Sequence, residues 1–218
     1  PKHLTPERLT RIALTELRKV PKLQNCDAIS LMAAIMQSAQ LGLEPGGSLG
    51  HVYLIPYGNT CQFIIGYRGM IELSRRSGQI VSLTAHEVYE NDKFEFEYGL
   101  NEKLSHKPAL GERGNLVGVY AIAKIVGGGY QMDFMSKSDV DKIRARSKAS
   151  GSGPWATEYE EMAKKTVIRR LFKYLPVSIE VQKAVQTEER AEIDVTPAKD
   201  ILADFNISEE SFNIDHET

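Results

Sequence analysis

The chain has 218 residues and a mass of 24.4 kDa, enough for one large domain or for a domain followed by a tail. Its 42% hydrophobic and 26% charged residues are ordinary for a globular protein and exclude the collagen-like, coiled-coil and wholly disordered classes. No stretch approaches the roughly 18 consecutive apolar residues of a membrane span, and the first residues lack the apolar block of a signal peptide. We therefore expect a cytoplasmic protein with no membrane partner.

Charge is distributed unevenly along the chain. Residues 186–218 hold ten acidic and two basic side chains, a formal charge of −8, whereas residues 1–185 carry +6. This asymmetry predicts a body over 1–185 that binds nucleic acid or another polyanion, and an acidic, flexible tail over 186–218. A solvated surface with a loose terminus explains the same charges, so charge alone leaves both interpretations open.

The N-terminal region predicts a pair of apolar helices. The first is expected over 6–20, because Thr5 can cap it and Pro6 suits its first position. The second is expected from Asp27 until Gly42, with apolar residues at helical spacing.

The middle of the chain predicts strands joined by hairpins. Phe94, Phe96 and Tyr98 alternate with charged residues, which is typical of a sheet with one solvated face. The expected strands cover residues 51–57, 61–67, 79–89, 93–98, 116–126 and 130–135.

Further helices are expected between and after these strands. The first covers 68–77, and Ser136 resembles the start of a capping box that opens a second over 137–146. A long basic helix is predicted over 155–175, followed by a shorter one that ends at 185. The fold class is therefore α+β, an antiparallel sheet with a hairpin packed by the N-terminal helices and the long C-terminal basic helix.

One motif raises the possibility of an enzyme. Residues 46–50, GGSLG, match the GxSxG turn that exposes Ser48 as a nucleophile in hydrolases. That turn normally runs from a strand into a helix, and here a helix precedes it and a strand follows. A tight glycine turn is the favoured interpretation, and a metal-independent hydrolase or nuclease that uses Ser48 is the alternative.

Other catalytic and cofactor motifs are missing from the sequence. There is no GxxxxGK[ST] loop for a nucleotide, the five histidines are scattered, and Cys26 and Cys61 lack metal-site spacing. We expect no catalytic residues, no metal and no cofactor.

Basic residues gather in the predicted C-terminal helices. Lys165, Arg169 and Lys173 are spaced four residues apart, so they form one stripe, with Val167 and Leu171 roughly opposite. We expect the apolar side to pack and the stripe to contact DNA phosphates. Further candidate phosphate ligands in this region are Arg144, Arg146, Lys148, Lys164 and Arg170.

Aromatic residues accompany a second set of bases. Tyr67 and Arg68 begin the short helix after the first hairpin, and Arg75 and Arg76 end it. Basic side chains that follow the sugar-phosphate backbone, together with aromatic rings on which nucleobases stack, are typical of single-strand binding. Other rings considered for this role are Tyr53, Tyr57 and Phe63 in the hairpin, and Trp155. Taken singly, each tyrosine could be a core residue and each arginine a surface residue.

Six short segments of the chain form a recognisable set: LGLEPG at 41–46, IIGYRGMI at 64–71, SKA at 147–149, GPW at 153–155, EMAKKT at 161–166 and IRRLFKYLP at 168–176. Together they closely resemble the RecT family of phage single-strand annealing recombinases. The resemblance runs in order from about residue 5 to residue 185 and leaves out the acidic tail.

The resemblance implies an activity and a set of partners. It implies a protein of a bacterial or phage-infected cell that binds single-stranded DNA without ATP, anneals it to a complementary strand and holds the annealed duplex intermediate. It also implies homo-oligomeric rings or helical filaments that act in DNA recombination with a phage exonuclease and a host single-strand-binding protein.

Overall fold

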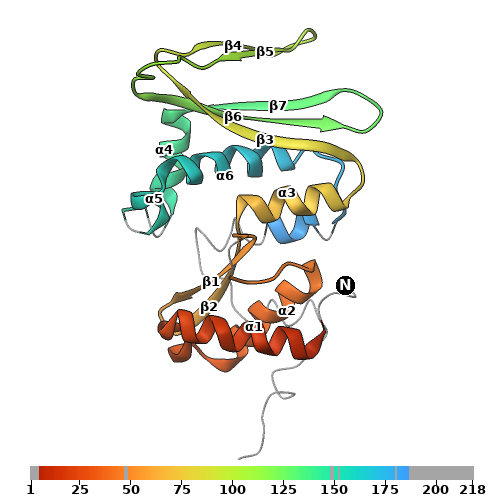
Figure 1. The fold of residues 1–218 in the computed structure, drawn as a ribbon, viewed down its shortest axis with the longest axis vertical. Helices are drawn as coiled ribbons and strands as arrows, with labels where there is room; N and C mark the ends of the chain where they lie inside the picture. Colours follow the sequence, from red (N-terminus) through yellow and green to blue (C-terminus); the bar gives the residue numbers. More distant parts are fainter. Residues whose placement is uncertain (1–4, 47–48, 148–149, 152, 180, 187–218) are drawn as a thin grey trace, which may run out of the picture. The chain divides into compact units, whose positions relative to one another are not determined.

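Figure 1 shows the computed structural model, which describes residues 5–46, 49–147, 150–151, 153–179 and 181–186. The chain forms two compact units: unit 1 is Pro1–Leu73 with Ile179–Thr218, and unit 2 is Ser74–Ser178. The predicted acidic tail after residue 186 lies outside the described residues.

Unit 1 begins with the predicted helical pair. Its elements are α1 (Pro6–Lys19), the 3₁₀ helix η1 (Pro21–Asn25), α2 (Ala28–Leu41), β1 (Val52–Tyr57), β2 (Thr60–Ile65) and most of α3 (Tyr67–Arg76). The side chain of Thr5 accepts a hydrogen bond from the backbone N–H of Arg8, and Asp27 caps α2 through Ser30. Gly42 ends α2 with a φ of 63°, a conformation that glycine adopts readily. Both helix predictions are confirmed.

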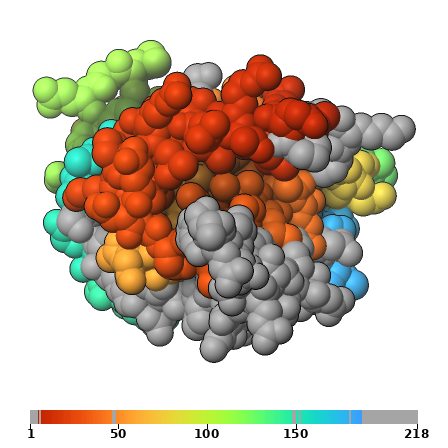
Figure 2. Space-filling view, turned by 90° about the horizontal axis from the view of Figure 1, so that it is seen from below, coloured from red at the N-terminus to blue at the C-terminus, as the bar shows by residue number. Residues whose placement is uncertain are grey.

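The first hairpin packs its buried face against α2. Strands β1 and β2 pair antiparallel from Val52 opposite Ile65 to Tyr57 opposite Thr60. The hydroxyl of Ser30 in α2 accepts a 2.9 Å hydrogen bond from the backbone N–H of Cys61 and so ties the helix to the hairpin. Helix α1, red in Figure 2, lies at the surface, in agreement with the exposure of most of its side chains.

Two backbone segments cross closely where β2 leads into α3. The carbonyl oxygen of His51 accepts a 2.9 Å hydrogen bond from the N–H of Gly66. A Cβ atom on Gly66 would lie 2.3 Å from the carbonyl oxygen of Gly50, and one on Gly69 would lie 2.2 Å from that of His51. Only glycine permits this close approach of two backbone segments. The close approach fixes the start of α3 beside Gly50.

Unit 2 is built around a three-stranded antiparallel sheet in the order β3–β6–β7, and a separate two-stranded ribbon, β4–β5. Its elements are β3 (Ile80–Tyr89), β4 (Lys93–Glu97), β5 (Lys103–Lys107), β6 (Leu116–Ile125), β7 (Tyr130–Ser136), α4 (Lys137–Arg146), α5 (Pro154–Thr157) and α6 (Tyr159–Phe172). The α+β class with antiparallel pairing is confirmed, and β5 is a strand that the sequence pattern did not predict.

The three-stranded sheet lies between the β4–β5 ribbon and helix α6 (Figure 1). Aromatic rings fill the layer under the ribbon: Phe94 lies 5.7 Å from Tyr120 and 5.1 Å from Phe134 between ring centroids, and Phe96 lies 5.6 Å from Phe134. Buried aliphatic residues fill the layer between the other face of the sheet and α6. These include Val119, Ala121, Ala123, Val167 and Leu171.

The long helix predicted over 155–175 is wrong. The backbone leaves the helical region at Glu158, with φ −137° and ψ 51°, so α5 is a separate short helix and α6 ends at Phe172. The sequence has no proline or glycine between Pro154 and Pro176, which explains the continuous prediction. Residues 181–186 are helical, in part agreement with the shorter helix expected there.

Candidate nucleic-acid interface

The basic stripe predicted on α6 does not face solvent as expected. Lys165 and Arg169 are each only 5% exposed, while Lys173, just after the helix, is exposed. The prediction of an open stripe is therefore wrong for two of its three residues. Helix α6 is buried on nearly all sides, so the simple division into an apolar and a basic face fails.

Arg170 and Lys164 hold α6 to the sheet through ion pairs. Arg170 makes two 2.5 Å contacts with the carboxylate of Asp133 in β7 and donates to the carbonyl oxygen of Phe134 at 2.7 Å. Lys164 lies 2.8 Å from Glu87 in β3 and 2.6 Å from Glu161. Burial disfavours the charged Lys164, yet its hydrogen bonds to these two carboxylates outweigh burial and raise its pKa.

The candidates around α4 and α5 are only partly accessible. Arg144 donates a 2.7 Å hydrogen bond to the carbonyl oxygen of Ser150, whereas Arg146 is exposed. Trp155 is 3% exposed, so the prediction that its ring is available for stacking is wrong. Its indole N–H has no hydrogen-bond partner among the described residues. Lys148 lies outside the part of the chain that the structure describes.

The structure brings several predicted contacts together at the start of α3. Arg68 is exposed and its Nε donates a 3.3 Å hydrogen bond to the hydroxyl of the half-buried Tyr67. Tyr53 in β1 is 46% exposed. A Cβ atom on Gly50 would lie 2.8 Å from the Tyr53 hydroxyl and 3.9 Å from Cδ of Arg68, so both side chains flank the same glycine.

The remaining predicted contacts divide between the far end of α3 and the hairpin interior. Arg75 and Arg76 are exposed in the last turn of the helix. Phe63 is buried and Tyr57 is half-buried, so among the hairpin aromatics Tyr53 is the most exposed. The glycines at 50, 66 and 69 were the available signal for this arrangement, because they mark a close crossing of backbones.

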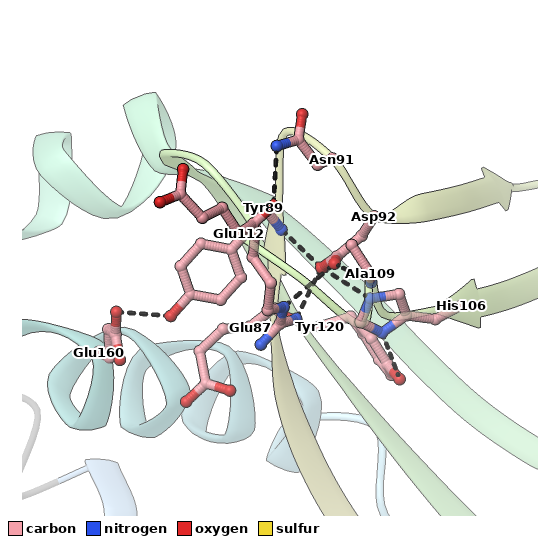
Figure 3. A network of polar contacts seen from close by, with 10 residues as sticks. Glu87, Tyr89, Asn91, Asp92, His106, Ala109, Glu112, Tyr120 and Glu160 are labelled. Atoms are coloured by element: carbon pink, nitrogen blue, oxygen red, sulfur yellow. Dashed lines mark hydrogen bonds and ion pairs between the residues drawn. The ribbon is translucent and has the colours of Figure 1, made fainter.

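A polar network in unit 2 was not anticipated from the sequence (Figure 3). The carboxylate of Asp92 has no solvent-accessible surface; it accepts hydrogen bonds from Arg113 and from the N–H groups of Tyr89 and Ala109. The hydrogen bond from Arg113 is the main cause that holds the pKa of Asp92 far below its usual range. His106 bridges Asp92 and Tyr120, at 3.1 Å and 3.3 Å.

This network has a structural role. All its protein partners lie where the β4–β5 ribbon leaves the sheet, and Tyr89 extends it to α6 by a 2.6 Å hydrogen bond to Glu160. The carboxylate of Asp92 is fully engaged, so it is not available as a general base. The Asn91-Asp92 turn was the visible signal in the sequence, but its partners are distant along the chain.

The structure offers little support for the hydrolase alternative. Ser48 lies outside the described residues, and the elements around it are helix α2 before and strand β1 after, the reverse of a nucleophile elbow. Within the described ranges, no three His, Cys, Asp or Glu side chains come close enough to hold a metal ion. No helix in those ranges is both long and apolar enough to span a bilayer.

Comparison with known proteins identifies the family. The sequence profile described as RecT family matches residues 7–201. The protein RecT of Escherichia coli (strain K12) is 54% identical over 206 residues, which is 91% of this chain and 77% of RecT. The uncharacterized protein YqaK of Bacillus subtilis (strain 168) is 31% identical over 181 residues, 82% of this chain and 63% of YqaK. The chain therefore belongs to the RecT family.

Proposed function

We propose that this protein binds single-stranded DNA and anneals it to a complementary strand without ATP, as a recombinase of the phage type. The observation that carries the proposal is the family match over residues 7–201. The exposed arginines of α3, with the exposed Tyr53 and the half-buried Tyr67 beside Arg68, supply a surface for it. The order of the elements around residues 46–50, helix α2 before and strand β1 after, does not favour the hydrolase alternative.

The geometry at α3 supports a phosphate-binding role. Arg68 and Arg75 are seven residues apart, so they lie on one side of the helix and their Cα atoms are separated by about 10 Å. Arg76 extends the basic end. Such side chains hold a strand by its phosphates and do not distinguish its sequence.

Two tyrosines, the exposed Tyr53 and the half-buried Tyr67, suit the nucleobases. Tyr53 and Tyr67 lie beside Arg68, and aromatic rings bind any base by stacking. A strand held in this way by its phosphates keeps base edges free to test a second strand. Pairing then provides about 1.4 kcal/mol per stacked step, so selection rests on complementarity and no ATP is needed.

We further propose that protomers assemble into rings or helical filaments. A span of about 10 Å on α3 can hold only a few nucleotides, so a stable nucleus needs neighbouring protomers that extend the surface. The remaining proposed DNA contacts are the exposed Lys173 and Arg146, Lys148, and the partly accessible Arg144.

The partners follow from the same proposal. A phage exonuclease would generate the single strand, and a host single-strand-binding protein would be displaced from it in the bacterial cytoplasm. The protein acts by binding and needs no catalytic residue. The acidic residues of 186–218 would supply a docking segment for a basic surface on a partner.

The test is a fluorescence annealing assay with two complementary oligonucleotides, with and without ATP, comparing the Arg68→Ala/Arg75→Ala variant with wild type. We expect annealing without ATP, and in a parallel binding titration the slope of log affinity against log salt should fall by about 1.4 for two lost phosphate contacts. Arg11→Ala/Arg18→Ala on α1 is the matched control, since both residues are exposed. A strict need for ATP, or an equal loss in the control, would contradict the proposal.

A further inference from the structure

The β4–β5 ribbon has two open edges. Among the described residues, no third strand pairs with β4 or with β5. The ribbon rests on the sheet through its aromatic face and through the Asp92 network, and its other face is exposed. Unpaired backbone N–H and C=O groups along such edges are a template for another strand.

The edges of the three-stranded sheet differ from those of the ribbon. Arg113 donates to the carbonyl oxygen of Glu87 in β3 at 3.1 Å, and Arg170 donates to that of Phe134 in β7. Each outer strand of the sheet thus has one backbone carbonyl oxygen that accepts a hydrogen bond from an arginine side chain. In the described part of the chain no side chain is bonded to the backbone of β4 or β5, so the ribbon offers the more accessible edges.

The charges on the exposed face choose between the possible pairings. Within the ribbon, Lys93 lies opposite Lys107, Glu95 opposite Ser105 and Glu97 opposite Lys103. Pairing β5 with β5 of a second copy about Ser105 would oppose Lys103 and Lys107 twice, which is unfavourable.

Pairing unlike strands is better. If β5 of one copy lies beside β4 of the next in the register of the ribbon, Lys103 meets Glu97, Ser105 meets Glu95, and a single like-charged pair remains, Lys107 with Lys93. Leu104 then lies opposite Phe96, and His106 opposite Phe94. The inward side chains of one copy therefore continue the inward face of the next, and the charged side chains continue the exposed face. Pairing β4 with β4 about Glu95 would place Lys93 opposite Glu97 twice, but it would oppose Glu95 to itself and leave β5 open. The pairing of β5 with β4 uses both edges of every copy.

We propose that the β4–β5 ribbon is an assembly surface, in which β5 of each copy pairs antiparallel with β4 of the next copy. The proposal rests on the assembly part of the proposed function and names the surface that makes it. Because the two edges differ, the contact is heterologous and repeats from copy to copy, which generates a ring or an open helix.

The repeated ribbon couples assembly to DNA. Lys93 and Lys107 alternate along one line, one ammonium per strand at a spacing of about 4.8 Å. Neither residue has a carboxylate within ion-pair distance in the described residues. Such a row repels itself unless an anion lies along it, so single-stranded DNA strengthens the contact.

The test uses single-cysteine variants in a full-length Cys26→Ser background, in which the remaining Cys61 is buried. Glu95→Cys and Ser105→Cys proteins carrying tags of different size are mixed, treated with diamide and separated on a non-reducing gel. Neither variant can form the bond within one copy. Facing positions on paired strands lie within disulfide reach.

We expect the mixed-size dimer to dominate and to increase at least threefold with an oligonucleotide, an increase that Lys93→Ala/Lys107→Ala abolishes. Val117→Cys replaces Ser105→Cys in the control, since it is exposed on β6 outside the ribbon. A mixed dimer no more abundant than this control, or a Glu95→Cys homodimer as the main product, overturns the proposal. Annealing measured on the same samples tells this failure apart from failure of the proposed function.

Discussion

Gly66 and Gly69 are the residues on which the shape of the α3 surface depends most directly. Their positions face backbone carbonyl oxygens that cannot move aside as a side chain would. We expect Gly66→Ala and Gly69→Ala each to lower the free energy of unfolding by about 1–3 kcal/mol, as overpacking does. Urea denaturation measures the loss. Gly111→Ala, at an exposed position with open space around it, should be within about 0.5 kcal/mol of wild type. Equal effects at all three positions would mean that the close crossing is not the cause.

Asp92 should make stability depend on acid. Its pKa is lowered in the folded protein, chiefly by Arg113, so the carboxylate contributes stability above its unfolded pKa near 3.9 and loses it as pH falls further toward the folded value. We expect Asp92→Asn to be less stable than wild type at pH 7, with the difference shrinking below about pH 4. Thermal unfolding from pH 2.5 to 7 checks this. A gap that stays constant across that range would show that the charge of Asp92 is not what stabilises the ribbon junction.

Ser48 separates the annealing protein from the hydrolase alternative. If residues 46–50 form a turn with no nucleophile, Ser48→Ala should keep the annealing rate within about threefold of wild type. A small polar-to-alanine change in a turn is not among the kinds of substitution that strongly destabilise a protein. The annealing assay and an esterase or nuclease assay are run on the same protein. Hydrolytic turnover that disappears in the variant would restore the enzyme interpretation.

At the scale of elements, the helices with local signals were predictable. Helices α1, α2 and α4 each begin at a side-chain cap, and their apolar spacing is contained in a few turns. Strand β5 was not, because KLSHK is mostly polar and its only inward residues are Leu104 and His106. Its existence depends on pairing with β4 and on the rings of β6 and β7, which periodicity within a segment cannot reveal.

The candidate site was predictable in part for the same reason. The sequence singled out Tyr67 and Arg68, and the structure places Tyr53 beside them. It could not show that Arg170 pairs with Asp133, which lies 37 residues earlier in the chain. Helical spacing gives the direction of a side chain around its own axis and not the number of elements that surround the helix.

The C-terminal end of helix α6 allows a buried basic residue, Arg169, to be compared with an exposed one, Lys173. Lys173→Ala should lower the salt slope of single-strand binding by about 0.7, the value for one phosphate contact, with little change in stability. Arg169→Ala should instead lower stability by about 2 kcal/mol and leave the slope unchanged, because the side chain is buried. Salt titrations and urea denaturation measure the two quantities. The reverse assignment would mean that Arg169 becomes accessible when DNA binds.

At the scale of the whole molecule, the charge is divided between the basic residues 1–185 and the acidic residues 186–218. The RecT family profile ends at residue 201, inside the acidic part. Residues 202–218 contain five carboxylates and no lysine or arginine, so their removal raises the net charge from −2 to +3. A neighbouring polyanion competes with DNA for the same cations, most strongly at low salt.

We therefore expect a chain that stops at residue 201 to anneal normally and to bind nonspecific DNA more tightly than wild type below about 50 mM salt, with the difference fading near 0.2 M as screening grows. A full-length variant with Asp204, Asp215, Glu209, Glu210 and Glu217 changed to the corresponding amides separates charge from chain length, and it should behave like the truncated protein. Fluorescence anisotropy over a salt series provides the affinities. Tighter binding in the truncation alone would attribute the effect to excluded volume, and loss of annealing in either folded variant would place part of the annealing machinery beyond residue 201.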